Sequence, residues 1–270
     1  MIVSTINVNG IRAAVKQRSE TNRGLLTWLA DTTVDVVCLQ ETRANDNQLS
    51  AALKPALVDG WHLASAGAHL KGRNGVAILS RHPLRAVRHL ECDEFALHGR
   101  YLEADIGDLT VASVYIQTGE ADTVRQLEKE RFMAALANRM AVLAGDGRDA
   151  VVCGDWNIAH TENDIKVWKA RVKKSGFLPS ERQWLTDLLD TGGVDVVRVL
   201  HPGVPGPYSW WSWRGRAFDN DAGWRIDYQL ATPDLAARAS AARVERAAAY
   251  ALRWSDHSPV TVEYLAAARP

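Results

Sequence analysis

The stretch Val34-Asp-Val-Val-Cys-Leu-Gln-Glu41 is an apolar, β-branched run that ends in an amide and a carboxylate. Such a run predicts a buried β-strand. A second stretch, Asp149-Ala-Val-Val-Cys-Gly-Asp-Trp156, has the same character and also ends at a carboxylate. The faint similarity between the two stretches suggests a duplicated sheet, with one acidic strand end in each half.

Further strands and helices are expected on both sides of these runs. The expected strands are Ile2–Val8, Val34–Gln40, Gly75–Ser80, Tyr101–Ile106, Leu109–Gln117, Ala150–Cys153, Trp224–Ala231 and Pro259–Tyr264. The expected helices are Thr21–Asp31, Asn47–Leu57, Ala121–Leu143 and Glu181–Thr191. Ser180 would cap the last helix, and the third would carry an apolar stripe of Val124, Leu127, Phe132, Leu136, Met140 and Leu143. The Ala/Arg-rich segment 236–251 is expected to be surface helix or irregular structure.

The order of these elements favours an α/β fold with mixed sheets. Helices and strands are interleaved, but without strict βαβ alternation, and Gly107-Asp108 joins two expected strands as a hairpin. A largely antiparallel pair of sheets with outer helices therefore fits better than an open parallel sheet. No Pro/Ser-rich linker divides the chain, so residues 1–270 are expected to form a single domain.

Composition excludes several protein classes. The 270 residues are 47% hydrophobic and carry 32 basic against 32 acidic side chains, which is typical of a globular protein but lacks the overall positive charge of many nucleic-acid binders. The three cysteines, Cys38, Cys92 and Cys153, have no zinc-site or disulfide-framework spacing and favour a reducing, cytoplasmic location. No apolar run approaches the roughly 18 residues of a membrane span, and no signal peptide or membrane contact is expected.

Polar residues gather at the ends of the expected strands. At these ends or next to them are Asn7, Glu41, Tyr115, Asp155, Asn157, Asp256 and His257, and Asp227 lies inside the expected strand Trp224–Ala231. A carboxylate in a buried strand is unfavourable unless it is paired, hydrogen-bonded or bound to metal. The oxygen donors among these side chains suit Mg²⁺, with Mn²⁺ as a possible substitute, better than Zn²⁺. Such a site suits the attack of water on a phosphoester.

Five motifs, which contain all of these residues except Tyr115, occur in the order known from one enzyme family. They are Asn7-Val-Asn-Gly-Ile-Arg12, Leu39-Gln-Glu-Thr42, Gly154-Asp-Trp-Asn-Ile-Ala159, Gly223-Trp-Arg-Ile-Asp-Tyr228 and Ser255-Asp-His-Ser-Pro-Val260. From Ile2 to about Tyr264 the chain resembles the exodeoxyribonuclease III / abasic-site (AP) endonuclease branch of the endonuclease–exonuclease–phosphatase superfamily. The resemblance implies a four-layer αββα sandwich, two packed mixed β-sheets flanked by helices. It also implies base-excision repair: Mg²⁺-dependent hydrolysis of DNA 5′ to abasic sites, and trimming of 3′ ends.

The resemblance also implies a role for each residue of the strand ends. Glu41 would be the principal metal ligand, with Asn7 and Asp256 beside it. Asp155 would activate water, and Asn157 would stabilise the transition state or help to hold a second metal. His257, oriented by Asp227, and Tyr115 would contact the phosphate. The family often continues from this tyrosine with Pro-Asn-Gly, whereas this chain has Ile116-Gln-Thr-Gly119, so the DNA contact of that asparagine is not carried over.

DNA contacts are expected from aromatic and basic residues near these motifs. Trp224 and Trp210 would form the walls of a pocket that admits a flipped abasic sugar, whereas Trp211 and Trp213 are expected to pack in the core. The segment Lys166–Lys174, with Arg171, Lys173 and Lys174, and also Arg12 would contact phosphates. The plainer alternative for the segment is a solvated helix face. The partner would be double-stranded DNA with abasic sites or 3′ ends, and a monomer suffices for this chemistry.

The same residues are also compatible with two other functions. One is a different phosphoesterase of the same superfamily, acting on phospholipids or inositol phosphates, which the neutral net charge mildly favours. The other is a DNA-binding protein that has lost its activity, but that alternative is disfavoured because every expected metal ligand and general base is present. The balance between abasic incision and 3′-end trimming, the number of metal ions and the preferred metal are not determined by the sequence.

Overall fold

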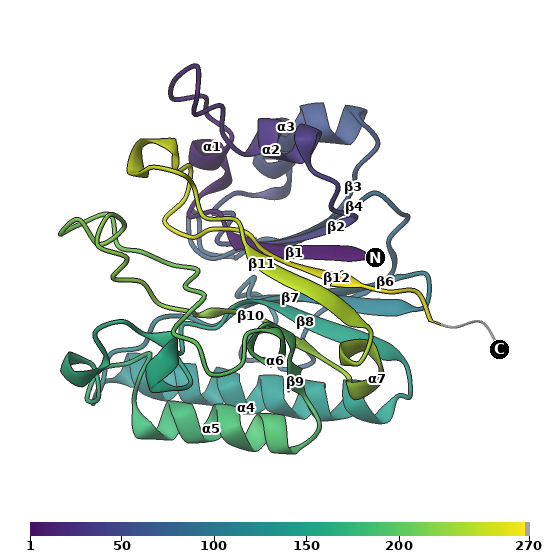
Figure 1. Cartoon of the computed structure of the whole chain (residues 1–270). Helices are drawn as coiled ribbons and strands as arrows, with labels where there is room; N and C mark the ends of the chain where they lie inside the picture. The colour runs from purple at the N-terminus through teal and green to yellow at the C-terminus, as the bar shows by residue number, and fades with distance from the viewer. Residues whose placement is uncertain (268–270) are drawn as a thin grey trace.

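Two six-stranded β-sheets pack face to face in the computed structural model, which describes residues 1–267 (Figure 1). The first sheet has the order β11-β12-β1-β2-β4-β3. Its strands are β1 (Ile2–Asn7), β2 (Val36–Gln40), β3 (His62–Ala66), β4 (Val76–Ser80), β11 (Ala239–Val244) and β12 (Val260–Tyr264). The second has the order β5-β6-β7-β8-β10-β9. Its strands are β5 (Arg85–Arg88), β6 (Tyr101–Ile106), β7 (Leu109–Tyr115), β8 (Asp149–Asp155), β9 (Val194–Asp195) and β10 (Asp227–Ala231).

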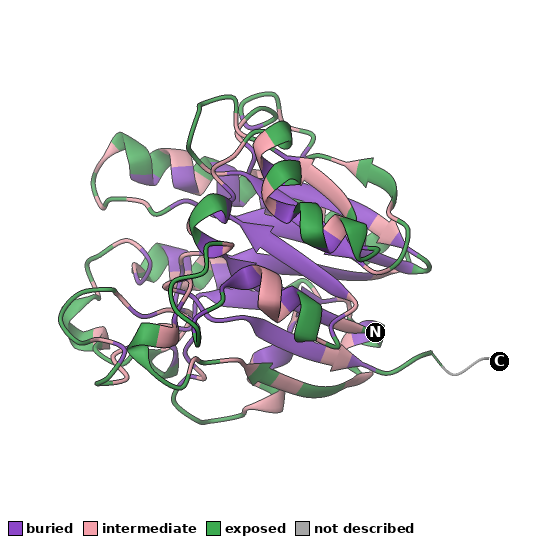
Figure 2. Ribbon diagram, turned by 90° about the horizontal axis from the view of Figure 1, so that it is seen from above, coloured by how far each residue is buried: buried purple, intermediate pink, exposed green. Residues whose placement is uncertain are grey.

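Helices cover the outer face of each sheet, so the four-layer arrangement is confirmed. The helices are α1 (Ile11–Ala14), α2 (Leu25–Asp31), α3 (Asp46–Val58), α4 (Val124–Gly145), α5 (Pro179–Asp190), α6 (Val196–Leu200) and α7 (Pro233–Ala236). Helices α1 to α3 lie on the first sheet, and the long α4 and α5 lie on the second (Figure 1). The central strands are buried on both faces, as the purple strands of Figure 2 show. Among the described residues, no helix has both the length and the apolar character needed to cross a bilayer.

The two sheets repeat one pattern of strand directions. In each, the third and fourth strands of the order run parallel, β1 with β2 and β7 with β8. All other neighbours run antiparallel. The similar stretches that end at Glu41 and Asp155 form β2 and β8, which occupy equivalent places in the two sheets. The duplication suggested by the sequence is therefore present in the topology.

Several expected boundaries are wrong, each for a local reason. Segment 236–251, expected to be surface helix or irregular structure, contains the edge strand β11, because pairing with β12 outweighs the helix preference of alanine, and it is irregular at residues 245–249. Trp224 makes only isolated bridges, so β10 begins at Asp227. Helix α2 begins only at Leu25, after Gly24 at φ 78°. The short strands β3, β5 and β9 carry no clear alternation and were not expected.

Helices α4 and α5 also differ from expectation at their first turns. Ser180 does not cap α5; the helix starts at Pro179, and Glu181 accepts a hydrogen bond from the Leu178 amide. At the start of α4, Val124 and Leu127 are exposed, whereas Gln126 and Lys129 are buried. The apolar stripe is therefore correct only for the later turns, which contain Phe132, Leu136, Met140 and Leu143.

Candidate active site

The expected polar residues meet at one edge of the two sheets. The parallel pairs β1/β2 and β7/β8 end there at Asn7, Gln40, Tyr115 and Asp155. Because β10 runs antiparallel to β8, its first residue, Asp227, lies opposite Asp155. Strand β12 runs antiparallel to β1 and brings the loop of Asp256 and His257 to the same edge. In Figure 1 this edge faces left, where the loops between the strands project.

Asp155 is the centre of the hydrogen-bond network. Its Oδ2 accepts hydrogen bonds from the amide groups of Asn7, at 2.8 Å, and Asn157, at 3.1 Å. The backbone N–H of Asn157 donates to Oδ1 at 2.9 Å. Asn7 also donates to Oε1 of Glu41 at 2.9 Å and so links the carboxylates of the two sheets. Four of the residues expected to bind metal are therefore directly connected.

His257 and Asp227 form a buried pair beside Asp155. Nδ1 of His257 lies 2.8 Å from Oδ2 of Asp227, and Nε2 lies 3.7 Å from Oδ2 of Asp155. Ser209 donates a hydrogen bond of 2.5 Å to the same Asp227 oxygen. The imidazole is thus held by one carboxylate and presents its other nitrogen towards the second. This is the arrangement expected for a histidine that contacts a phosphate.

Burial and charge shift the pKa values of this group. Burial raises the pKa of Asp155 to about 7, with the cation of His257 opposing the shift and Asp227 adding to it. Burial alone would lower the pKa of His257, but Asp227 and Asp155 outweigh it and raise the value to about 10. Burial, with Glu41 and Asp155, also raises the pKa of Tyr115 well above its usual value. Near neutral pH the histidine is therefore a cation and the tyrosine a neutral hydrogen-bond donor.

Asp256 is connected to this group through Asn9, which the sequence did not indicate as functional, and it also contacts the predicted pocket residue Trp210. Its Oδ1 accepts a hydrogen bond from Asn9 at 2.9 Å, and its Oδ2 accepts one from the indole of Trp210 at 3.1 Å. The backbone N–H of Asn9 in turn donates to Oδ1 of Asn7. Asn9 has a positive φ of 48°, so the repeated asparagine of Asn7-Val-Asn-Gly was the available signal.

Glu41 has a cationic neighbour that was also missed. The guanidinium of Arg43 donates two hydrogen bonds to Oε2 of Glu41, one of them from Nε at 2.9 Å. Both residues have positive φ, 47° for Glu41 and 49° for Arg43, and the turn between them places the arginine over the carboxylate. Its position two residues after Glu41 was visible in the sequence, but only the positive-φ turn brings the two side chains together.

The two pocket tryptophans lie together next to Asp256. The rings of Trp210 and Trp224 meet edge to face, with centroids 6.0 Å apart, and both are half-buried. Trp211 packs in the core as expected, but Trp213 does not: its side chain is 41% exposed and meets the Tyr250 ring edge to face. The expectation of core packing for Trp213 is wrong because its loop extends beyond the sheets.

Of the residues expected to contact phosphates, Arg171 lies over the ring of Trp224. The guanidinium carbon of Arg171 is 5.6 Å from the centroid of the Trp224 ring. Lys173 and Lys174 are exposed on the following turn, and Arg12, the last residue of the Asn7 motif, is exposed on α1. The segment of residues 166–174 is irregular apart from one 3₁₀ turn, Trp168–Ala170, so it is not a solvated helix face.

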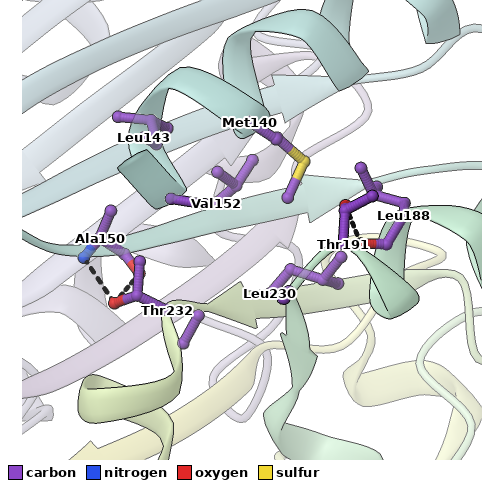
Figure 3. A pocket seen from close by; sticks show the side chains of 12 residues that line it. Met140, Leu143, Ala150, Val152, Leu188, Thr191, Leu230 and Thr232 are labelled. Carbon is purple, nitrogen blue, oxygen red and sulfur yellow. Dashed lines mark hydrogen bonds between the residues drawn. The ribbon is translucent and has the colours of Figure 1, made fainter. Parts of the chain in front are cut away.

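The molecule has a large cleft beside Tyr115 and a small apolar cavity elsewhere, and the two differ in size and in the polarity of their lining. The cleft, of about 900 Å³, opens beside Tyr115, and Asn74, Arg100, Gln117 and Thr118 also line it. The cavity of about 20 Å³, drawn in Figure 3, lies between α4, α5 and the second sheet. Its lining is mostly apolar, from Met140, Leu143, Val152 and Leu230. It has room for about one water molecule, so it is a packing gap rather than a ligand site.

The donor set fits a divalent cation. Ligand atoms of Asp155, Asp227 and His257 lie within 4.8 Å of one another, but Asp227 and His257 are paired with each other, so Asp155 is the member of this group that faces a cation. Oδ1 of Asp227 is buried and has no hydrogen-bond partner within residues 1–267. The side-chain amide of Asn7 donates to carboxylate oxygens of both Asp155 and Glu41 and so holds them close together. The raised pKa of Asp155 indicates that neighbouring cations do not fully compensate the charge of this buried carboxylate. Oxygen donors of this kind are typical of Mg²⁺ and Mn²⁺ sites.

Comparisons with known proteins agree with this geometry. The family model described as "Endonuclease/Exonuclease/phosphatase family" matches residues 4–257. The exodeoxyribonuclease of Bacillus subtilis (strain 168) is 32% identical over 255 residues, which cover 94% of this chain and 95% of that protein. The "DNA repair nuclease APEX1" of Danio rerio is 31% identical over 266 residues, covering 97% and 81%.

Solved structures of nucleases are also similar to this chain over nearly its whole length. The 3′-5′ exonuclease NExo of Neisseria meningitidis superposes with a TM-score of 0.87 and 33% identity, covering 98% of this chain and 99% of that one. A second structure, described as the 3′ phosphatase NExo bound to product DNA hairpin, matches equally well. An AP endonuclease from Archaeoglobus fulgidus has a TM-score of 0.86 and 28% identity, covering 98% and 99%.

Proposed function

Because this chain belongs to the endonuclease/exonuclease/phosphatase family, we propose that it is a Mg²⁺-dependent DNA-repair phosphodiesterase. It hydrolyses the backbone 5′ to abasic sites and trims 3′ ends in base excision repair, as a 3′-5′ exonuclease and 3′ phosphatase. The observation that carries this proposal is the buried group of Asp155, His257 and Asp227 at the edge where both sheets end. The relatives named as exodeoxyribonuclease, exonuclease and AP endonuclease support both activities.

The side chains divide the hydrolytic step between them. Asp155 orients the attacking water and accepts its proton, which requires the ionised form. His257, kept cationic by Asp227, donates a hydrogen bond to the phosphate and stabilises the charge that develops there. Tyr115 donates from its neutral hydroxyl group to the same phosphate. Asn7, Glu41, Asp155, Asn157 and Asp256 are the proposed metal ligands, and bound Mg²⁺ supplies neutralisation of the phosphate and the leaving oxygen.

DNA is the proposed substrate because the surroundings of the site suit it. Trp210 and Trp224 form an edge-to-face aromatic wall next to Asp256, suited to a sugar without a base. Arg171, Lys173, Lys174 and Arg12 are exposed and available for phosphates. The neutral net charge of the whole chain had left lipid phosphates open as substrates. These exposed cations instead give the surroundings of the site a local positive charge that suits the DNA backbone. We propose a monomer in the cytoplasm, where the free thiols Cys38 and Cys153 stay reduced.

Incision of a duplex with one tetrahydrofuran abasic analogue tests the function directly. The analogue cannot undergo β-elimination, so a cut reports hydrolysis. We expect cleavage on the 5′ side of the analogue with Mg²⁺ and none with EDTA, and trimming of a recessed or phosphorylated 3′ end under the same conditions. A folded protein that cuts none of these substrates with Mg²⁺ or Mn²⁺ contradicts the proposal. Hydrolysis of inositol phosphates instead would support the other branch of the family.

Replacement of Trp224 by alanine is expected to weaken abasic incision more than 3′-end trimming. The substitution removes the ring that faces Trp210, whereas the group around Asp155 is unchanged. We expect a loss of about 10- to 100-fold in kcat/KM on the abasic duplex, in line with the loss of one large apolar contact with the sugar. Trp224→Phe serves as the matched control and should retain most of the activity. Equal losses on both substrates would show that the tryptophan does not recognise the damage.

A further inference from the structure

A lysine without any exposed surface lies behind the active site. Lys129, on the second turn of α4, and Glu181, on the first turn of α5, are both 0% exposed. Nζ of Lys129 lies 2.7 Å from Oε1 of Glu181 and donates a second hydrogen bond of 2.9 Å to the backbone carbonyl of Asn157. The buried ion pair therefore touches the main chain of a proposed active-site residue.

Glu181 holds a turn of the chain through both carboxylate oxygens. Its Oε2 accepts hydrogen bonds from the backbone N–H groups of Gly176, at 2.6 Å, and Leu178, at 3.1 Å. Its Oε1 accepts from Ser175 at 2.9 Å and from the side chain of Gln126 at 3.1 Å, in addition to Lys129. The turn Ser175–Leu178 is thus held through three of its own groups, directly after the basic segment that ends at Lys174.

The fixed turn is packed against the site itself. The carbonyl of Gly176 accepts a hydrogen bond of 2.8 Å from the backbone N–H of Ala159. A Cβ atom at Gly176 would lie 3.1 Å from the carbonyl oxygen of Asn157 and 3.1 Å from the Trp224 ring, so there is little space for one. Asn157 itself has a positive φ of 49°, and its side chain donates to Asp155. The ion pair therefore connects Asn157, Trp224 and the basic segment.

Stability alone does not explain this pair. Burial lowers the pKa of Lys129, against the attraction of Glu181, which reflects the free energy needed to remove the charge from water. Well-packed apolar residues in place of a buried ion pair are often as stable or more stable. Two apolar side chains, however, would satisfy neither the Asn157 carbonyl nor the N–H groups of Gly176 and Leu178. The charges are needed where backbone groups must be held in place.

We propose that Lys129 and Glu181 are positioning residues, which fix Asn157 against Asp155 and set the turn that carries the basic segment and borders Trp224. This inference rests on the proposed function for its kinetic effect, but the arrangement itself is independent of it. A misplacement of about 1 Å at a reacting centre reduces turnover by as much as about 100-fold. Loss of the pair is therefore expected to lower kcat by about 10- to 100-fold, with a smaller change in KM.

The double variant K129M/E181M separates positioning from stability. The double variant leaves no uncompensated charge, so its melting temperature should lie above that of either single variant, although the backbone groups left without a partner lower it relative to the unchanged protein. Its kcat on the abasic duplex should fall as stated, and amide hydrogen exchange should accelerate at Ala159, Gly176 and Leu178. The matched control is R131M with E94Q, which removes an exposed ion pair of 2.7 Å that includes a residue of the same helix, and it should change neither property.

Turnover and amide exchange together distinguish failure of the proposed function from failure of the positioning role. Unchanged kcat and unchanged exchange in a folded double variant would overturn the positioning role. If the unchanged protein cuts no DNA, the proposed function fails, and the exchange data alone then decide the inference. If the double variant does not fold, Glu181→Asp is measured by the same two criteria. It keeps the charge but is one methylene too short to reach Lys129 and the turn together, so normal kcat and exchange in that variant would also overturn the proposal.

Discussion

Replacement of Asp155 by asparagine is expected to lower the turnover of a duplex with one abasic site by about 10²- to 10⁴-fold, the range for loss of a general base. The amide side chain would keep the size of the carboxylate and could still accept hydrogen bonds, but it cannot take a proton from water. The affinity for the duplex should change little, because Trp224 and the exposed cations lie outside the Asp155 network. The loss should therefore appear in kcat and not in binding.

Single-turnover cleavage and equilibrium binding in EDTA measure the two effects separately. Asp149→Asn is the matched control, because Asp149 starts the same strand, β8, and pairs with Arg238 at its far end. The control should cut the abasic duplex at the unchanged rate. Equal losses of binding and turnover in Asp155→Asn would instead show that this carboxylate contributes to substrate affinity and not to the chemical step.

The sequence predicted where many of these polar residues meet, because strand ends have a simple geometry. Apolar runs identify β1, β2, β7 and β8, and the residue after or at the end of each run must lie at an edge of its sheet. Asn7, Glu41, Tyr115 and Asp155 could therefore be located before their partners were known. The chain direction of β10 and β12 then determines whether Asp227 and His257 reach the same edge, and sequence periodicity does not contain that direction.

The sequence did not reveal the residues whose contacts depend on turns or on burial by elements distant in the chain. Arg43 reaches Glu41 only through a turn with positive φ, and Asn9 reaches Asp256 across 247 residues of sequence. Lys129 appears in the sequence as an ordinary helical lysine, because nothing local indicates that α5 will cover it. Its partner Glu181 was noted only as a helix residue. A charged side chain at 0% exposure is recognised only when the neighbouring elements are in place.

Replacement of Asp227 by asparagine is expected to change both the rate and the pH dependence. In the metal-free site the pKa of Asp155 is about 7 and that of His257 about 10. Bound Mg²⁺ lowers both, so the activity of the unchanged protein should rise below about pH 7 as Asp155 ionises and fall on the alkaline side as His257 loses its proton. Burial lowers the pKa of His257, and the charge of Asp227 is the largest cause opposing it. Without that charge the pKa of His257 falls, so the alkaline limb should move to lower pH by more than about one unit, as expected when a close opposite charge is lost. Turnover near neutral pH should fall by about 10²- to 10³-fold.

The acid limb should move much less than the alkaline limb in this variant. The charge of Asp227 raises the pKa of Asp155, whereas the cation of His257 lowers it, and the variant weakens both influences together. Ser209→Ala is the matched control, because it removes a hydrogen bond of 2.5 Å to Asp227 but leaves the carboxylate charge. Its alkaline limb should stay near that of the unchanged protein. A pH–rate profile of kcat/KM, with an NMR titration of the His257 ring, distinguishes the two variants. An unchanged alkaline limb in Asp227→Asn would mean that the charge of His257 does not control turnover, because Asp227 is the carboxylate that keeps that charge in place.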